Sequence, residues 1–338
     1  MKKIYFSLVA IAILATSACT SGTAKKNEKA LSLDELIEKH PDSIPLLLKR
    51  GNERFKNYEY EKAMEDAARA FRLDSNQFDV RLLYANVLNN RTERSIEQVS
   101  IAQRHFRKLL TAQPRNTEVL IGLASTYSQF QDFENSFKYI NEALRIDPKY
   151  RDAYVLKGSN YAVLGKPDLM KSSYETAVQQ DPNFFAGYLV LGSIYENENS
   201  PLCIEYYTTA YQLEPENREA KYAMAYAMQH FGKLESAKEI YRNMAKDTAE
   251  YYASQALFQL GHIKQMVNGD LDSAMYFYEG ATFVKPDFVE AYHNLGVCYD
   301  LKGNKPKALK SFSKALKHNP SYKLSRDYAD SLGRIMGL

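Results

Sequence analysis

The side chains best suited to chemistry or to anchoring a ligand gather in the last third of this sequence. They are aromatic, histidine or methionine residues spaced four apart in two stretches, with one histidine in a third: Tyr222, Tyr226 and His230; Phe258, His262 and Met266; and His293. A spacing of four places side chains on one face of a helix. Aromatic side chains bury much area at little entropy cost, so the set predicts a surface that anchors a binding partner.

Two other interpretations of these residues stay open. Some of the aromatic rings could turn inward and pack between helices. The three histidines could also bind a metal ion or respond to pH, but they step along the helices and no acidic ligand joins them. We therefore expect no metal and no cofactor.

Motifs of the common catalytic sites are absent from the sequence. It has no glycine-rich phosphate-binding loop, no HExxH motif, no GxSxG motif and no paired-cysteine metal spacing. We therefore predict that the protein is not an enzyme.

The composition is that of a chain able to bury a core. Its 338 residues are 45% apolar and 25% charged, with 26 tyrosines, 16 phenylalanines and no tryptophan. The formal net charge of +3 includes Lys2 and Lys3, and it is too small for a nucleic-acid-binding surface. Three cysteines are too few for a disulfide framework.

The first nineteen residues have the pattern of an export signal. The two lysines precede a mostly apolar run, 4–15, that is too short to span a bilayer as a helix. Residues 16–19, Thr-Ser-Ala-Cys, resemble the lipobox of bacterial lipoproteins, although Thr16 stands where that family prefers leucine. The resemblance implies a signal peptide at 1–18, acyl chains such as palmitate on Cys19, and a flexible tether at 19–30. The alternative is a plain secretory signal cut near Ala18.

The residue after the cysteine bears on the destination. Thr20 replaces the acidic residue that retains such lipoproteins at the inner membrane of well-studied bacteria. By that resemblance the protein goes to the outer membrane. No acidic cluster follows to indicate surface display, which favours the periplasmic face.

A repeat of about 34 residues fills the rest of the chain. Prolines that follow helical stretches mark its period: Pro114, Pro148 and Pro182, and then Pro286 and Pro320. Small residues recur in the first helix of each unit, at Gly51, Ala85, Ala124, Gly158, Gly192, Ala225, Gly261 and Gly296. An aromatic ring four residues after the anchor position of the second helix fills the space between neighbouring pairs, at Phe106, Tyr174, Tyr207, Tyr241, Tyr278 and Phe312.

This pattern resembles the tetratricopeptide repeat. The resemblance implies an all-α fold, an α-solenoid in which about eight helix pairs stack into a right-handed superhelix. It also implies a non-catalytic array whose first helices line a concave groove that binds proteins or peptides. We expect units at 44–77, 78–116, 117–150, 151–184, 185–217, 218–251, 252–288 and 289–322, within an array at 44–322. Capping helices are expected at 31–43 and 323–338. Cys203 and Cys298 lie three units apart, so we expect no bridge between them.

Short polar residues follow the small residue of the first helix in five units: Asn52, Asn86, Ser125, Ser159 and Ser193. Such a series could hold the backbone of an extended peptide. The alternative is that small polar residues simply tolerate a solvated face.

Charge is segregated along the array. Residues 44–116 and 289–338 are net basic, whereas residues 117–217 are net acidic. Such banding could steer a partner or support salt-sensitive self-association, and the alternative is ordinary solvated helix faces.

These features together predict a non-catalytic scaffold or adaptor of the bacterial cell envelope. It would bind an envelope protein or a peptide segment in its groove and attach to the membrane by its acyl anchor. The alternative function is capture of a glycan or peptidoglycan strand by the aromatic residues, which the lack of tryptophan disfavours.

Overall fold

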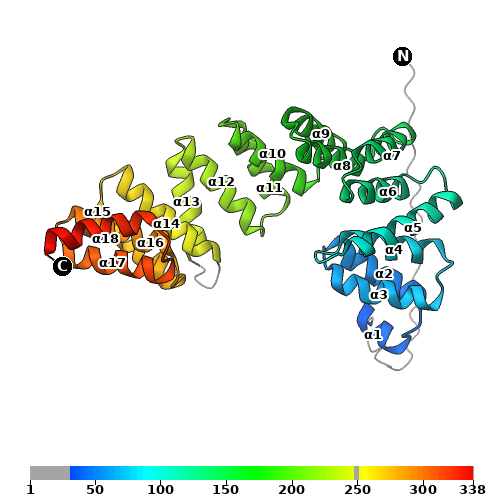
Figure 1. The fold of residues 1–338 in the computed structure, drawn as a ribbon, viewed down its shortest axis with the longest axis horizontal. Coiled ribbons are helices and arrows are strands. Elements are labelled where there is room, and N and C mark those ends of the chain that lie inside the picture. The colour runs from blue at the N-terminus through cyan, green and yellow to red at the C-terminus, as the bar shows by residue number, and fades with distance from the viewer. Residues whose placement is uncertain (1–30, 247–250, 338) are drawn as a thin grey trace, which may run out of the picture. The chain divides into compact units, whose positions relative to one another are not determined.

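The computed structural model describes residues 31–246 and 251–337, and every helix or strand assigned within them is an α-helix (Figure 1). The expected all-α fold is therefore confirmed. The predicted signal peptide, Cys19 and the tether lie outside the described residues. None of the described helices is both long and apolar enough to cross a membrane.

The helices follow one another in consecutive pairs along the chain. The first five are α1 (Leu33–Lys39), α2 (Ile44–Lys56), α3 (Tyr60–Leu73), α4 (Phe78–Asn90) and α5 (Ile96–Ala112). The next six are α6 (Thr117–Gln129), α7 (Phe133–Ile146), α8 (Arg151–Val163), α9 (Pro167–Gln180), α10 (Phe185–Asn197) and α11 (Leu202–Leu213). The last seven are α12 (Arg218–His230), α13 (Leu234–Met244), α14 (Tyr251–Met266), α15 (Leu271–Val284), α16 (Val289–Leu301), α17 (Lys305–His318) and α18 (Lys323–Met336).

Helix packing divides the chain into two compact units, and the boundary falls between Val87 and Leu88, inside α4. The first unit contains α1, α2, α3 and the start of α4. The second contains the end of α4 and all later helices.

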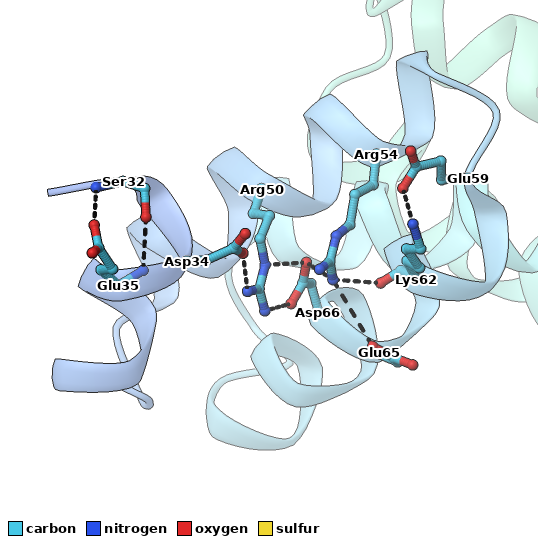
Figure 2. A network of polar contacts seen from close by, with 9 residues as sticks. All are labelled: Ser32, Asp34, Glu35, Arg50, Arg54, Glu59, Lys62, Glu65 and Asp66. Carbon is cyan, nitrogen blue, oxygen red and sulfur yellow. Dashed lines mark hydrogen bonds and ion pairs between the residues drawn. The ribbon is translucent and has the colours of Figure 1, made fainter.

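A buried carboxylate ties together the first unit (Figure 2). The side chain of Asp66 on α3 is 2% exposed and accepts hydrogen bonds from Arg50 at 2.6 and 3.0 Å and from Arg54 at 2.8 Å. The two arginines lie one turn apart on α2, and Arg50 also donates to Asp34 of α1 at 2.7 Å. The hydrogen bonds to Asp66 and Asp34 raise the pKa of Arg50. Pairing with two arginines offsets the cost of burying the Asp66 carboxylate. The network therefore joins α1, α2 and α3 through polar groups.

In the second unit, each helix packs on its neighbours in chain order. The first helix of a pair packs on its own second helix, as α6 does on α7, and that second helix packs on the next first helix, as α7 does on α8. First helices of neighbouring pairs also touch, as α6 with α8 and α12 with α14. This is the nearest-neighbour packing of a solenoid, in which each pair buries its apolar face against the next.

Glycines in four first helices lie directly under an aromatic ring of the second helix. A Cβ atom would stand 2.5 to 2.8 Å from the ring in the pairs Gly158–Tyr174, Gly192–Tyr207, Gly261–Tyr278 and Gly296–Phe312. That separation is shorter than van der Waals contact, so only glycine allows the ring to sit there. The small residues of the repeat thus set how closely the two helices approach. Cys203 and Cys298 are buried free thiols, as expected.

Candidate partner-binding cleft

The five short polar residues expected along the groove differ in their surroundings. Asn52 is exposed, and its amide donates to a carbonyl of its own helix at 2.8 Å. Ser125 and Ser159 are half-buried and share hydrogen bonds with side chains of neighbouring helices at 2.9 and 3.1 Å. Asn86 is half-buried and Ser193 is exposed. The hydroxyls of Ser125 and Ser159 already have hydrogen-bond partners inside the protein. The five residues therefore do not form a continuous series of free polar groups. Their binding to a peptide stays a prediction.

A partly open cleft lies between α12 and α14, where three of the predicted anchoring residues come together. Its volume is about 280 Å³. It is lined by three residues of α12, one of α13, two of α14 and one just beyond α14: Tyr226, Gln229, His230, Leu234, His262, Ile263 and Val267. Two adjacent first helices therefore supply most of its walls.

The cleft offers exposed rings above an apolar floor. Tyr226 is 40% exposed, whereas Ile263 is 1% exposed. His262 is half-buried, and desolvation lowers the pKa of its imidazole, so the ring is neutral at pH 7 and both donates and accepts a hydrogen bond. No lysine, arginine or carboxylate is among the lining residues. The site is therefore suited to a neutral group with an apolar body.

Hydrogen bonds hold several side chains around the cleft in place. The Nε2 of His230 lies 2.8 Å from the Oδ1 of Asn199, in the loop after α10. Gln229, on the same helix as His230, donates to Gln259 of α14 at 3.1 Å, and Gln259 donates to the hydroxyl of Tyr222 at 3.1 Å. The two glutamines thus connect α12 with α14.

Two of the predicted anchoring residues have turned inward, which is the alternative that the spacing left open. Tyr222 is half-buried, with its ring 6.2 Å from that of Tyr226 and 5.6 Å from that of Tyr252, and desolvation raises the pKa of Tyr222 to about 12. Phe258 is half-buried, with its ring 5.6 Å from that of Tyr278 on α15 and 5.2 Å from that of Phe288, which directly precedes α16. Met266, in contrast, is 66% exposed at the end of α14.

His293 is not on an open surface, and its expected place in the groove is wrong. The residue is 8% exposed, and its Nδ1 lies 3.0 Å from the hydroxyl of Ser325 on α18. The rings of Phe312, Tyr322 and Tyr328 surround it at 5.5 to 5.6 Å. The final helix and the turn before it therefore cover the position that an inner repeat would leave open. Burial lowers the pKa of His293.

Gln229 and Gln259 were not among the residues singled out from the sequence. A signal for Gln229 was present: it stands four residues after the small residue Ala225, and the matching positions of α10 and α14 are also polar, Glu196 and Gln265. Gln259 has no comparable sequence signal, because its role depends on which neighbour faces it.

Three segments of the chain match models of the tetratricopeptide repeat: residues 117–150, 152–184 and 289–322. The chain contains tetratricopeptide repeats. Proteins built from this repeat generally bind peptides or other proteins as interaction scaffolds, and such scaffolds are generally non-catalytic.

Individual relatives are distant and larger. The chain is 23% identical over 242 residues to RNA polymerase-associated protein CTR9 of Caenorhabditis elegans, covering 68% of this chain and 20% of that protein. It is 21% identical over 293 residues to anaphase-promoting complex subunit 3 of Schizosaccharomyces pombe, covering 85% of this chain and 42% of that protein. It therefore spans between a fifth and about two fifths of the length of these relatives.

A solved structure shares the fold. The crystal structure of the APC/C hetero-tetramer Cut9-Hcn1 superposes with a TM-score of 0.52 at 16% identity, covering 88% of this chain and 56% of that one. At that identity the likeness extends to the fold alone.

Proposed function

We propose that this protein is a non-catalytic scaffold that binds a partner protein or an extended peptide, and that the cleft between α12 and α14 belongs to the binding surface. The observation that supports the cleft is the exposed ring of Tyr226 beside the neutral imidazole of His262, above an apolar floor that includes Ile263. Exposed aromatic groups over a preformed hollow are the usual anchors of a protein interface.

Attachment to an envelope membrane is a second part of the proposal. It is supported by the lipobox-like residues 16–19 and the apolar run before them. An acylated Cys19 would hold the array at a surface and raise the local concentration of its partner. Replacing Cys19 by serine is expected to abolish incorporation of labelled palmitate and to release the protein from membranes on fractionation. Unchanged membrane attachment would contradict this part alone.

Cross-linking in the producing cells, followed by mass spectrometry, tests the binding surface. The double variant Tyr226→Ala/His262→Ala is expected to lose a protein that the wild type captures. The matched control is Tyr276→Ala, which removes a tyrosine that is 72% exposed on α15 and does not line the cleft. If the double variant and the control capture the same proteins as the wild type, the cleft is not the binding surface.

A further inference from the structure

In two helix pairs of the second unit, the aromatic residue of the second helix forms a hydrogen bond with a residue near the end of the first helix. In the pair α10–α11, the hydroxyl of Tyr207 donates to Glu196 at 2.6 Å. In the pair α14–α15, the hydroxyl of Tyr278 donates to Gln265 at 2.7 Å. Each acceptor stands four residues after the glycine on which the ring packs. The ring position and the hydrogen bond are therefore parts of one arrangement.

The pair α12–α13, between those two, has the same residue types but lacks the bond. Its tyrosine is Tyr241 and its polar residue is Gln229. Both the hydroxyl of Tyr241 and the Oε1 of Gln229 are buried and have no hydrogen-bond partner in the part of the chain that the structure describes. Buried polar groups are rarely left unpaired, so the two unpaired atoms in one helix pair need an explanation.

The small residue of the first helix differs between these pairs. The neighbouring pairs have Gly192 and Gly261, where a Cβ would stand 2.5 to 2.8 Å from the ring, whereas this pair has Ala225. A ring placed as Tyr207 or Tyr278 is placed would lie too close to the methyl group that Ala225 carries, which accounts for the missing bond of Tyr241. Its hydroxyl then misses Gln229, whose amide instead donates across to Gln259 on α14.

The unpaired acceptor belongs to the wall of the cleft. Gln229 lines it together with Tyr226 and His262, and none of the lining side chains is charged. An unpaired buried acceptor is unfavourable, and a ligand group that donates a hydrogen bond to it removes that penalty. Because the oxygen itself is covered in the free protein, its amide must turn toward the cleft and give up its bond to Gln259, which the broad terminal torsion of glutamine permits.

We propose that the cleft receives a tyrosine side chain of the partner peptide, whose hydroxyl donates to the Oε1 of Gln229. Its ring would lie against Tyr226 and His262 and on the apolar floor of Leu234 and Ile263. This assignment rests on the proposed function and names the residue type that the cleft selects. Lysine and arginine are disfavoured because the lining offers no carboxylate. Phenylalanine fills the same space but leaves the acceptor unpaired.

Titration of the full chain, with ¹³C-labelled isoleucine, leucine and valine methyl groups, tests the proposal by NMR. The probes are Gly-Ser-Gly-Tyr-Gly-Ser-Gly and the same peptide with phenylalanine or tryptophan at the centre. The tyrosine peptide is expected to shift the methyl signals of Ile263, Leu234 and Val267 and to bind about tenfold more tightly than the phenylalanine peptide, the ratio that one good hydrogen bond supplies. Equal affinities, preference for tryptophan, or no binding of the tyrosine peptide would overturn the assignment.

Two variants separate the hydrogen bond from general packing. Gln229→Leu keeps the approximate volume and removes the acceptor, so it is expected to bind both peptides equally while retaining affinity for phenylalanine. Ala225→Gly frees the space for Tyr241, whose hydroxyl then pairs with Gln229, so the preference for tyrosine is expected to fall toward unity. A tyrosine preference that survives in both variants contradicts the proposal.

The two proposals fail in distinguishable ways. If Tyr226→Ala/His262→Ala loses its partner in cells but the wild type does not prefer the tyrosine peptide, the binding surface stands and the tyrosine assignment is wrong. If neither peptide binds and the double variant loses no partner, both are wrong.

Discussion

Removing one hydroxyl should stabilise this protein at one repeat and destabilise it at the neighbouring repeat. Tyr241 is fully buried, and its hydroxyl has no partner among the described residues. Tyr241→Phe therefore removes a desolvated group without breaking a hydrogen bond, and the free energy of unfolding is expected to rise by about 1 kcal/mol. Phe312 is a precedent in the chain itself, because phenylalanine occupies the same position of α17.

The control substitution has the opposite sign. Tyr207 is 5% exposed, and its hydroxyl donates to the carboxylate of Glu196 at 2.6 Å. Tyr207→Phe breaks that bond, and the expected loss is about 1 kcal/mol, because half-exposed Glu196 regains some hydration. Both substitutions remove one hydroxyl from the same sequence position of a repeat and leave the ring itself, so each measurement isolates the hydroxyl.

Urea unfolding followed by circular dichroism at 222 nm measures the two variants on the same footing. Because repeat arrays can unfold in parts, hydrogen exchange of the α12–α13 and α10–α11 amides should accompany it. Slower exchange is expected in α12–α13 of Tyr241→Phe, and faster exchange in α10–α11 of Tyr207→Phe. If Tyr241→Phe is destabilised as much as Tyr207→Phe, the hydroxyl of Tyr241 has a partner and the inference drawn from Ala225 is refuted.

Three further predictions concern other parts of the structure. Asp66→Asn leaves two arginines facing a neutral amide, so the free energy of unfolding should fall by about 3 kcal/mol. Chemical denaturation measures this change, and a loss below about 1 kcal/mol would contradict the network's role. Gly192→Ala puts a methyl group 2.5 Å from the ring of Tyr207, so the free energy of unfolding should fall by about 2 kcal/mol. The control Gly333→Ala has open space around it and should be neutral or slightly stabilising. Thermal melts of the two variants make the comparison. Burial lowers the pKa of His293, so between pH 6.5 and that lowered pKa the unfolded chain takes up a proton that the folded protein does not. The free energy of unfolding should therefore fall as the pH drops through that interval, and His293→Gln should flatten this slope in unfolding curves taken from pH 7.5 to 5; an unchanged slope would show that His293 is not its source.

The sequence alone determined the fold class, because the signals of this fold are local and recur. Prolines at a recurring interval close the helical stretches, and six of the eight units combine a small residue in the first helix with an aromatic residue in the second. A chain that stacks neighbour on neighbour needs no long-range pairing to be inferred, so the residues of one unit predict the next. The face on which Tyr226 and His262 lie also followed from spacing alone, and both line the cleft.

Only the tertiary structure decided which residues of that face are open. Tyr222 and Phe258 share the spacing of Tyr226 and His262, yet their rings are covered by neighbouring helices, and α18 covers His293. A four-residue period fixes the direction of a side chain, but its exposure depends on what the next pair places above it.

The buried pairings were likewise beyond the sequence. Asp66 lies in a stretch rich in charges, and nothing in that pattern distinguishes it from its exposed neighbours. In the sequence, Ala225 is one more small residue at the position where the neighbouring units have Gly192 and Gly261. At the glycines of the neighbouring units the gap between ring and backbone is narrower than a methyl group, and such a gap exists only once the helices are packed.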